Sequence, residues 1–313
     1  MEKLIIGLHH VTATVAGAQA DLEFFAGALG QRLVKKTINF DNPGVYHFYY
    51  GNESGAPGTI MTTFPYRAMG VRDGRRGAGQ ITTTSFSVPA EALQFWRQRL
   101  EARQVAYENE ESPFGEDVLR FSDPSGLALR LVGNASDHRP PWVLPEIGAD
   151  RAIRGIHGVT LLVREPAKTV AFLSEVLDGA VVGESADTVR MGLNGGAPGQ
   201  IVEVASAGDA PGAVNGLGTV HHVACAVKGE AEQLLMRREL VRRGVQVTEV
   251  LDRDYFRSIY FREPNGVLFE IATIPPGFLI DEPMSELGRS LKLPPWEEPR
   301  RAAIEASLPA VSH

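Results

Sequence analysis

Paired histidines begin two apolar, strand-like segments of this sequence. The first segment reads GLHHVTA at residues 7–13, and the second reads TVHHVACAV at residues 219–227. A third segment, GIHGVT at residues 155–160, has glycine in place of the second histidine. One histidine at a strand start commonly makes only hydrogen bonds, but a recurring phrase indicates equivalent positions, and neutral imidazole is the commonest metal ligand. His10 and His222 are therefore candidate metal ligands.

A carboxylate that could complete such a site lies in the apolar segment LFEIAT, at Glu270. Burying an unpaired carboxylate is costly, so a cation should meet it, either a metal ion or the guanidinium of Arg253. Two histidines and one carboxylate leave coordination positions open, which is typical of non-haem Fe(II) oxygenases, and Mn(II) accepts the same ligands. The alternative is a buried polar network without a metal.

Four segments of the chain share one order of elements and would position these residues. Each begins with a strand, continues with an amphipathic helix, and ends with strands and a turn rich in Pro and Gly. The segments span residues 4–64, 80–132, 154–204 and 218–273. Helices are expected at residues 18–29, 90–103, 166–177 and 230–243. The pattern predicts an α+β protein made of four βαβββ modules.

The turns indicate that a pair of modules has been duplicated. GAPGTIMTTF begins at residue 55 and GAPGQIVEVA at residue 196, while FSDPSGLALRL begins at residue 121 and FREPNGVLFEI at residue 261. We therefore expect one pair of modules at 1–137, a linker with several prolines at 138–150, and the second pair at 151–274. Residues 275–313 would form a C-terminal tail.

This arrangement resembles the vicinal oxygen chelate superfamily, which includes glyoxalases, bleomycin-resistance proteins and extradiol dioxygenases. The resemblance reaches to about residue 273 and implies a tandem glyoxalase-like fold, in which the modules form two pseudo-barrel cups. HHVTA, LVKKTINFDNPGVYHFYYG at residues 33–51 and the PPGFLIDEP tail more narrowly resemble hydroquinone-type ring-cleaving dioxygenases. In that group the metal ligands match His10, His222 and Glu270. The pocket residues match His9, Thr12, His221, Arg253 and Tyr260.

Two ways of pairing the modules would give different metal sites. The first-strand positions hold His10, Thr83, Gly158 and His222, and the last-strand positions hold Thr62, Arg130, Glu203 and Glu270. Pairing of neighbours would gather Glu203, His222 and Glu270. Pairing of the first module with the fourth would instead gather His10, His222 and Glu270, and Glu203 would face Arg130 in the other cup. We expect the second arrangement, because it brings both HHV phrases to one site.

The remaining pocket residues each have a structural and a chemical interpretation. His9 and His221 either orient the adjacent ligands or point to the opposite face of the strand, because successive strand residues alternate faces. Tyr260 either donates a proton in the reaction or only packs in its strand. Arg253 either stabilises an anion in the pocket or forms an ion pair at the surface. Residues 46–50, with the sequence YHFYY, are interpreted as core and cup wall.

The residue at the fourth ligand position favours an oxygenase. A glyoxalase-type isomerase would need a second carboxylate there, but the residue is Thr62. We therefore expect an Fe(II)-dependent dioxygenase that cleaves the ring of a hydroquinone-like phenol, with substituted or chlorinated rings included and Mn(II) as the alternative metal. A non-redox metal isomerase or lyase, and a metal-free protein that binds an aromatic drug, are the alternatives on the same scaffold.

Composition restricts the partners. The chain has 313 residues, a net charge of −7 and a single cysteine, Cys225. The negative charge argues against nucleic acid and an anionic membrane surface as partners. The lack of an internal disulfide and of a long apolar run fits a cytoplasmic protein. The resemblance to ring-cleaving dioxygenases implies a small aromatic substrate and dioxygen as its partners. Assembly of the chain into a homo-oligomer is compatible with the sequence.

The tail is more apolar than a solvated segment. Its apolar residues include Phe278, Leu279, Ile280, Met284 and Leu287. Because the tail follows the strand that carries Glu270, it is expected either to cover the mouth of the cup as a lid or to pack on the outside of the barrel.

Overall fold

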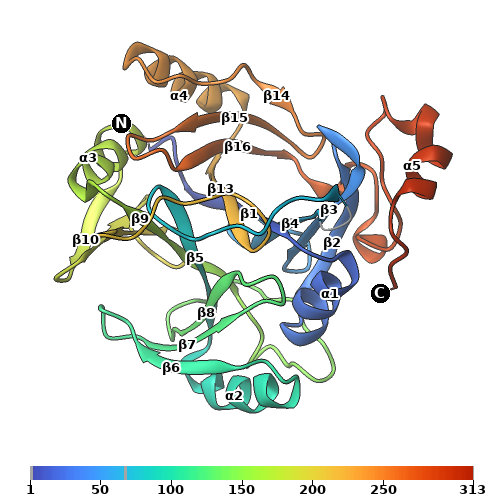
Figure 1. Cartoon of the computed structure of the whole chain (residues 1–313), viewed down its shortest axis with the longest axis horizontal. Coiled ribbons are helices and arrows are strands. Elements are labelled where there is room, and N and C mark those ends of the chain that lie inside the picture. Colours follow the sequence, from blue (N-terminus) through green and yellow to red (C-terminus); the bar gives the residue numbers. More distant parts are fainter. Residues whose placement is uncertain (1–2, 67–68, 313) are drawn as a thin grey trace.

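A computed structural model of the protein describes residues 3–66 and 69–312. The strands form two eight-stranded sheets, and the helices lie on the outside of the molecule (Figure 1). The strand order is β14-β15-β16-β13-β1-β4-β3-β2 in the first sheet and β10-β11-β12-β9-β5-β8-β7-β6 in the second. The fold is therefore α+β with tandem βαβββ modules, as the sequence pattern predicts.

The first sheet contains the strands of the first and fourth modules. They are β1 (Gly7–Val15), β2 (Arg32–Asn39), β3 (Asn42–Gly51), β4 (Ile60–Pro65), β13 (Thr219–Val227), β14 (Leu251–Asp252), β15 (Phe256–Arg262) and β16 (Leu268–Pro276). The two modules join where β1 pairs antiparallel with β13, so that Thr12 lies opposite His222. The predicted pairing of the first module with the fourth is confirmed.

The second sheet contains the strands of the second and third modules. They are β5 (Gln80–Val88), β6 (Tyr107–Glu111), β7 (Asp117–Ser122), β8 (Ala128–Gly133), β9 (Gly155–Val163), β10 (Ala180–Glu184), β11 (Thr188–Gly192) and β12 (Ile201–Ser206). Here β5 pairs antiparallel with β9. Each sheet thus combines one module from either half of the chain.

One helix follows the first strand of each module, and two differ from the prediction. α3 (Pro166–Leu177) and α4 (Glu230–Arg242) form where the apolar spacing predicts them. The helix expected at 18–29 is instead α1 (Ala18–Leu22) followed by a π-helix, η1 (Glu23–Ala28). The helix expected at 90–103 begins with a 3-10 turn, η3 (Ala90–Ala92), before α2 (Leu93–Ala102), and single turns of this kind are common at helix ends.

Central strands are buried along their whole length, whereas edge strands are exposed. Every residue of β1 is buried, because this strand is covered on both faces. The edge strand β6 reads YENEE and has no fully buried residue, and charged edges prevent unwanted strand pairing. Cys225 is fully buried on β13, and burial raises the pKa of its thiol to about 12, which fits a structural thiol rather than a nucleophile. No helix of the described residues is long and apolar enough to cross a membrane.

The tail packs along β2 and β3 on the right of Figure 1, as η4 (Phe278–Ile280), η5 (Met284–Glu286), η6 (Glu298–Arg300) and α5 (Arg301–Ser307). Phe278 and Leu287 are buried in a cluster with Tyr49 and Tyr255. The ammonium of Lys35, a residue with no exposed surface, binds two tail carboxylates, Asp281 and Glu282. These contacts fit the interpretation that the tail covers the outside of the barrel, and a lid function stays a prediction.

Candidate metal centre

Three buried side chains from three neighbouring strands converge inside the first cup. They are His10 on β1, His222 on β13 and Glu270 on β16. Nε2 of His10 lies 3.2 Å from Oε2 of Glu270, and Nε2 of His222 lies 2.8 Å from the same oxygen. The two Nε2 atoms are 3.3 Å apart. Among the described residues, no other group of His, Cys, Asp and Glu side chains has its ligand atoms close enough together to hold one metal ion.

The chemistry of the three side chains fits a divalent cation. Glu270 has no exposed surface, and its Oε2 is a buried oxygen that lacks a regular hydrogen bond. Burial alone would raise the pKa of the Glu270 carboxyl, but the two histidines hold that pKa well below its ordinary value. A divalent metal ion would neutralise this buried, ionised carboxylate and would bind the carboxylate and the two imidazole nitrogens as its ligands.

Each ligand histidine is held by the histidine that precedes it. Nδ1 of His10 lies 2.9 Å from Nδ1 of His9, and Nδ1 of His222 lies 2.7 Å from Nδ1 of His221. A histidine that offers the Nε2 lone pair to a metal carries its proton on Nδ1, so the preceding histidine must accept that proton in a hydrogen bond. Burial lowers the pKa of His9 to about 3, which keeps its ring neutral and able to accept.

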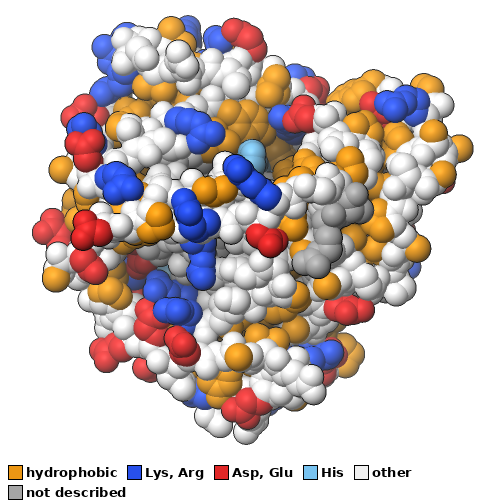
Figure 2. Space-filling view, viewed as in Figure 1, with side chains coloured by type: hydrophobic (Ala, Val, Ile, Leu, Met, Phe, Trp, Pro, Cys, Tyr) orange, Lys and Arg blue, Asp and Glu red, His pale blue; other side chains and the backbone are white. Residues whose placement is uncertain are grey.

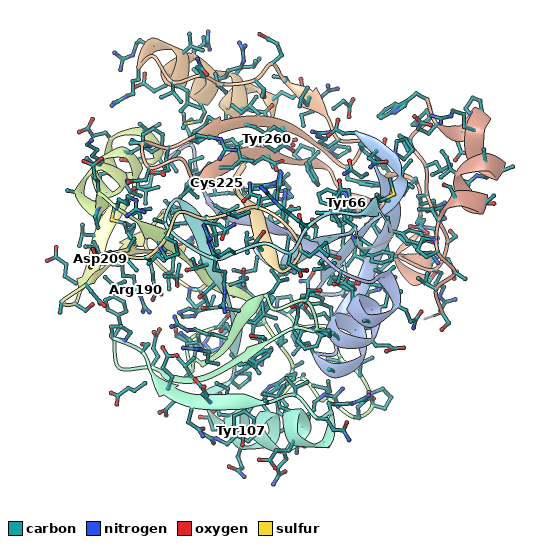
Figure 3. All side chains as sticks on the ribbon, in the orientation of Figure 1. Tyr66, Tyr107, Arg190, Asp209, Cys225 and Tyr260 are labelled. Carbon is teal, nitrogen blue, oxygen red and sulfur yellow. The ribbon has the colours of Figure 1, made fainter. Side chains whose placement is uncertain are left out.

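A cavity of about 320 Å³ opens above the three ligands. Strands β1, β3, β13 and β15 and the turn between β2 and β3 contribute to its wall. Figure 2 shows a histidine side chain at the bottom of a hollow edged by hydrophobic side chains, and Figure 3 labels two lining residues, Tyr260 and Tyr66. The cavity is large enough for a single aromatic ring. No tail residue is among the side chains that line it within the described chain.

The other residues expected in the pocket lie around this cavity. Thr12, His221, Arg253 and Tyr260 line it, whereas His9 lies behind the ligands against Phe256. The Tyr260 ring is 5.5 Å from the His222 ring. The guanidinium carbon of Arg253 lies 5.5 Å from the centre of the Tyr260 ring, and its Nη1 lies 3.3 Å from the exposed carboxylate of Asp41. Arg253 therefore both lines the cavity and forms an ion pair at its edge.

Thr62 lies beside His10, His222 and Glu270, but its hydroxyl interacts with other side chains. Its Oγ1 donates a hydrogen bond to Oγ1 of Thr12 over 2.9 Å and lies 2.8 Å from Nε2 of His47. The residue that occupies the fourth position is therefore a neutral hydroxyl in a hydrogen-bond chain, not a carboxylate.

Two residues contribute to the site in ways that the sequence did not predict. Ser258 donates a hydrogen bond to Oε1 of Glu270, and His47, which was interpreted as part of the core and cup wall, brings its imidazole to the cavity. The alternation of strand side chains could have found both. Ser258 lies two residues before Tyr260 on β15, and His47 lies two residues before Tyr49 on β3, so each shares a face with another cavity residue.

Comparison with known proteins identifies a family and several relatives of this chain. The model of the Glyoxalase/Bleomycin resistance protein/Dioxygenase superfamily matches residues 155–271. "Putative ring-cleaving dioxygenase MhqO" of Bacillus subtilis (strain 168) is 44% identical over 308 residues, which are 98% of this chain and 97% of that protein. "Chlorohydroquinone/hydroquinone 1,2-dioxygenase" of Sphingobium indicum is 35% identical over 300 residues, which are 93% of this chain and 92% of that protein.

Solved structures show the same fold. The crystal structure of a "putative dioxygenase" from Bacillus subtilis matches with a TM-score of 0.94 and 43% identity and covers 99% of both chains. Glyoxalase I from Zea mays matches with a TM-score of 0.63 and 12% identity over 85% of this chain and 92% of that chain, which extends the likeness of fold to a glyoxalase. The chain therefore belongs to the glyoxalase/bleomycin resistance protein/dioxygenase superfamily.

Proposed function

We propose that the protein is an Fe(II)-dependent dioxygenase that cleaves the ring of a hydroquinone-like phenol, with Mn(II) as the alternative metal. The observation that carries this proposal is the composition of the site, with two histidines, one carboxylate and a hydrogen-bonded threonine at the fourth position. This set leaves coordination positions open for small molecules. The names of the relatives, which include a chlorohydroquinone/hydroquinone 1,2-dioxygenase, support the same reaction class.

When bound, the iron would supply the electronic link through which ground-state dioxygen reacts with a closed-shell phenol. His10, His222 and Glu270 would hold it, while His9, His221 and Ser258 keep these side chains in their orientations. The aromatic side chains Tyr49, Phe64 and Phe256 in the wall would displace part of the water around a bound ring.

Two further residues are placed to handle charge and protons. Burial, reinforced by the negative charge of Glu270, raises the pKa of the Tyr260 hydroxyl, so Tyr260 keeps its proton at neutral pH and can donate it to an oxygen atom in the cavity. Arg253, beside Tyr260, would stabilise the negative charge of a phenolate. Thr12 would hold Thr62 in place through their hydrogen bond.

An isomerase is the contrasting function on this fold, and the absent carboxylate at the fourth position argues against it. In glyoxalase-type chemistry a second carboxylate would be available to move protons. Thr62 cannot serve in this way, because the pKa of a hydroxyl is far too high for a general base at neutral pH.

The test uses protein that is depleted of metal and loaded with Fe(II) without air. Oxygen uptake and ring-opened product are then followed with hydroquinone, methylhydroquinone, chlorohydroquinones and catechol. We expect uptake of one dioxygen for each ring cleaved with a para-diol. Turnover of a thiohemiacetal without oxygen by the zinc- or nickel-loaded protein would contradict the proposal. The variant His222→Ala serves as the inactive control.

A further inference from the structure

His47 is a fourth histidine in the cavity, besides His10, His221 and His222, and neither the metal ligands nor their partners use it. It lies on β3 and lines the same cavity as His10, His222 and Tyr260. The group of possible metal ligands does not include it. Two aromatic rings pack against its imidazole, with ring centres 4.1 Å away for Tyr49 and 4.2 Å away for Phe64. These contacts fix the position of the ring in the wall.

The hydrogen-bond chain beside His47 sets which of its nitrogens carries the proton. The hydroxyl of Thr62 has one hydrogen, and its oxygen lies 2.9 Å from Oγ1 of Thr12 and 2.8 Å from Nε2 of His47. When this hydrogen is directed at Thr12, Thr62 accepts from Nε2 of His47, and the imidazole proton is then on Nε2. Burial, with the surrounding histidines and Arg253, lowers the pKa of His47 well below its ordinary value, which agrees with a neutral ring.

The other nitrogen, Nδ1, is then an acceptor without a partner. The described residues provide no hydrogen bond to it. The space next to the half-buried His47 side chain is the cavity, from which a ligand can approach this nitrogen. A neutral acceptor in a largely apolar wall recognises a ligand that brings a hydrogen-bond donor.

The position of His47 in the sheet indicates which part of a ligand it would meet. β4 separates β3, which carries His47, from β1, which carries His10. Two strand spacings amount to about 10 Å along the sheet. A ring whose first oxygen lies at the metal would bring a substituent on its far side to His47, whereas an ortho substituent would stay close to the metal.

We propose that Nδ1 of His47 accepts a hydrogen bond from the hydroxyl para to the metal-binding oxygen, and thereby selects para-diols. This inference rests on the proposed function, because it takes a phenol as the ligand at the metal. In this inference, His47 recognises the second hydroxyl of the ring by accepting its hydrogen. A para substituent that has no hydrogen cannot make this bond.

The experiment compares two ligands that differ in this hydrogen. Hydroquinone and 4-fluorophenol have para substituents of similar size, but fluorine has no hydrogen to donate. Both are titrated calorimetrically under nitrogen into the Fe(II)-loaded protein. We expect the wild-type protein to bind hydroquinone about tenfold more tightly than 4-fluorophenol, the value of one buried hydrogen bond.

Variants separate the hydrogen bond from packing. His47→Phe should keep the aromatic packing and the iron content but reduce the preference to about one. His47→Gln, which offers a carbonyl oxygen, should restore part of the preference. Phe64→Leu, the packing control, should weaken the binding of both ligands alike and leave their ratio unchanged.

Two results would overturn the inference. One is a wild-type protein that binds the two ligands equally, and the other is a His47→Phe protein that still prefers hydroquinone. A failure of the proposed function is distinguishable, since it would appear as an absence of oxygen uptake and of ring-opened product, which the anaerobic binding ratio does not measure.

Discussion

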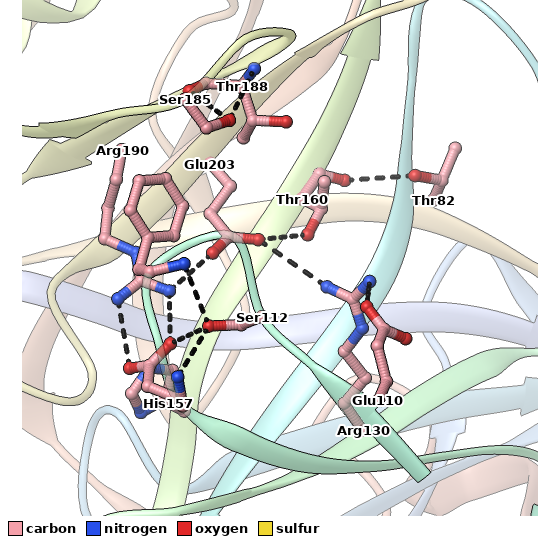
Figure 4. A network of polar contacts seen from close by, with 12 residues as sticks. Thr82, Glu110, Ser112, Arg130, His157, Thr160, Ser185, Thr188, Arg190 and Glu203 are labelled. Carbon is pink, nitrogen blue, oxygen red and sulfur yellow. Dashed lines mark hydrogen bonds and ion pairs between the residues drawn. The ribbon is translucent and has the colours of Figure 1, made fainter. Parts of the chain in front are cut away.

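The two cups have the same architecture, but different side chains fill them. In the first cup, two histidines and one carboxylate converge, and an open cavity lies beside them. In the second cup, a closed network of charges occupies the interior (Figure 4). Arg190 binds Glu116 over 2.6 Å and Glu203 over 2.7 Å, and Arg130 binds Glu110 over 2.7 Å. His157 lies 3.1 Å from Glu116.

Two substitutions between sibling modules account for this difference. Arg130 stands in the second module where Glu270 stands in the fourth, so a guanidinium replaces the carboxylate that would bind a cation. Gly158 stands in the third module where His10 stands in the first, and a Cβ there would lie 2.9 Å from Cβ and the carbonyl oxygen of Ile201. The second cup thus supplies its own cations and has no room for a histidine at this position, whereas the first cup must bind its cation from solution.

The largest effect is expected from removing a ligand in the first cup. His222→Ala should abolish both bound iron and oxygen uptake, because the remaining two ligands bind a divalent metal weakly. The chain should stay folded, with an unchanged circular dichroism spectrum. The matched variant Glu203→Gln in the second cup should keep a full complement of iron. Iron measured at wild-type levels in His222→Ala would remove His222 from the site.

The next largest effect concerns stability and belongs to the second cup. Arg190→Met should lower the free energy of unfolding by about 3 kcal/mol, because it leaves Glu116 and Glu203 largely buried without their main cation. Urea unfolding measures this value, and the iron content should not change. Addition of Glu116→Gln to Arg190→Met should recover part of the loss. A variant as stable as the wild type would show that the network is not needed for folding.

The sequence alone predicted the module pairing, the three candidate ligands of the first cup and one ion pair of the second, because those features depend on residue types at repeated positions. His10, His222 and Glu270 were identified in this way, and so was the meeting of Glu203 with Arg130, which lie 3.7 Å apart. Arg190 and Glu116 were not assigned to a cup, because Arg190 lies on β11 and Glu116 in the turn between β6 and β7, where the repeat offers no equivalent ligand position. His47 was assigned to the core and cup wall, but no chemical role was predicted for it. The π-helix at Glu23–Ala28 was also missed, since its apolar spacing is close to that of an α-helix.

A smaller effect is expected from the residues that orient the two carboxylates. Ser258 donates to Glu270 in the first cup, and Thr160 donates to Glu203 over 2.8 Å in the second. Ser258→Ala should weaken iron affinity by about 10- to 100-fold, since partners of metal ligands have effects of this size. Thr160→Val is the control and should leave iron affinity unchanged. Competition with a chelator measures both, and equal affinities in the two variants would contradict a role for Ser258.

The smallest effect is a difference in acid sensitivity. Burial alone would raise the pKa of the Glu116 carboxyl, but His157 and Arg190 hold that pKa well below its ordinary value. A depressed pKa stabilises the fold fully above the pKa of the unfolded chain, and this contribution is lost as the pH falls below about 4.5. Thermal melts of Glu116→Gln should therefore depend less on pH between about 5 and 3 than those of the wild type. Parallel pH profiles would exclude this contribution.

The central claim is that this chain binds one metal, in the cup formed by its first and fourth modules. The most direct measurement is an anomalous difference map from crystals of the Fe(II)- or Mn(II)-loaded protein. We predict one strong peak per chain, bonded to Nε2 of His10, Nε2 of His222 and the carboxylate of Glu270, with Thr62 unbound. A peak among Glu116, Glu203 and His157 in the second cup, or no peak in the first, would contradict the account.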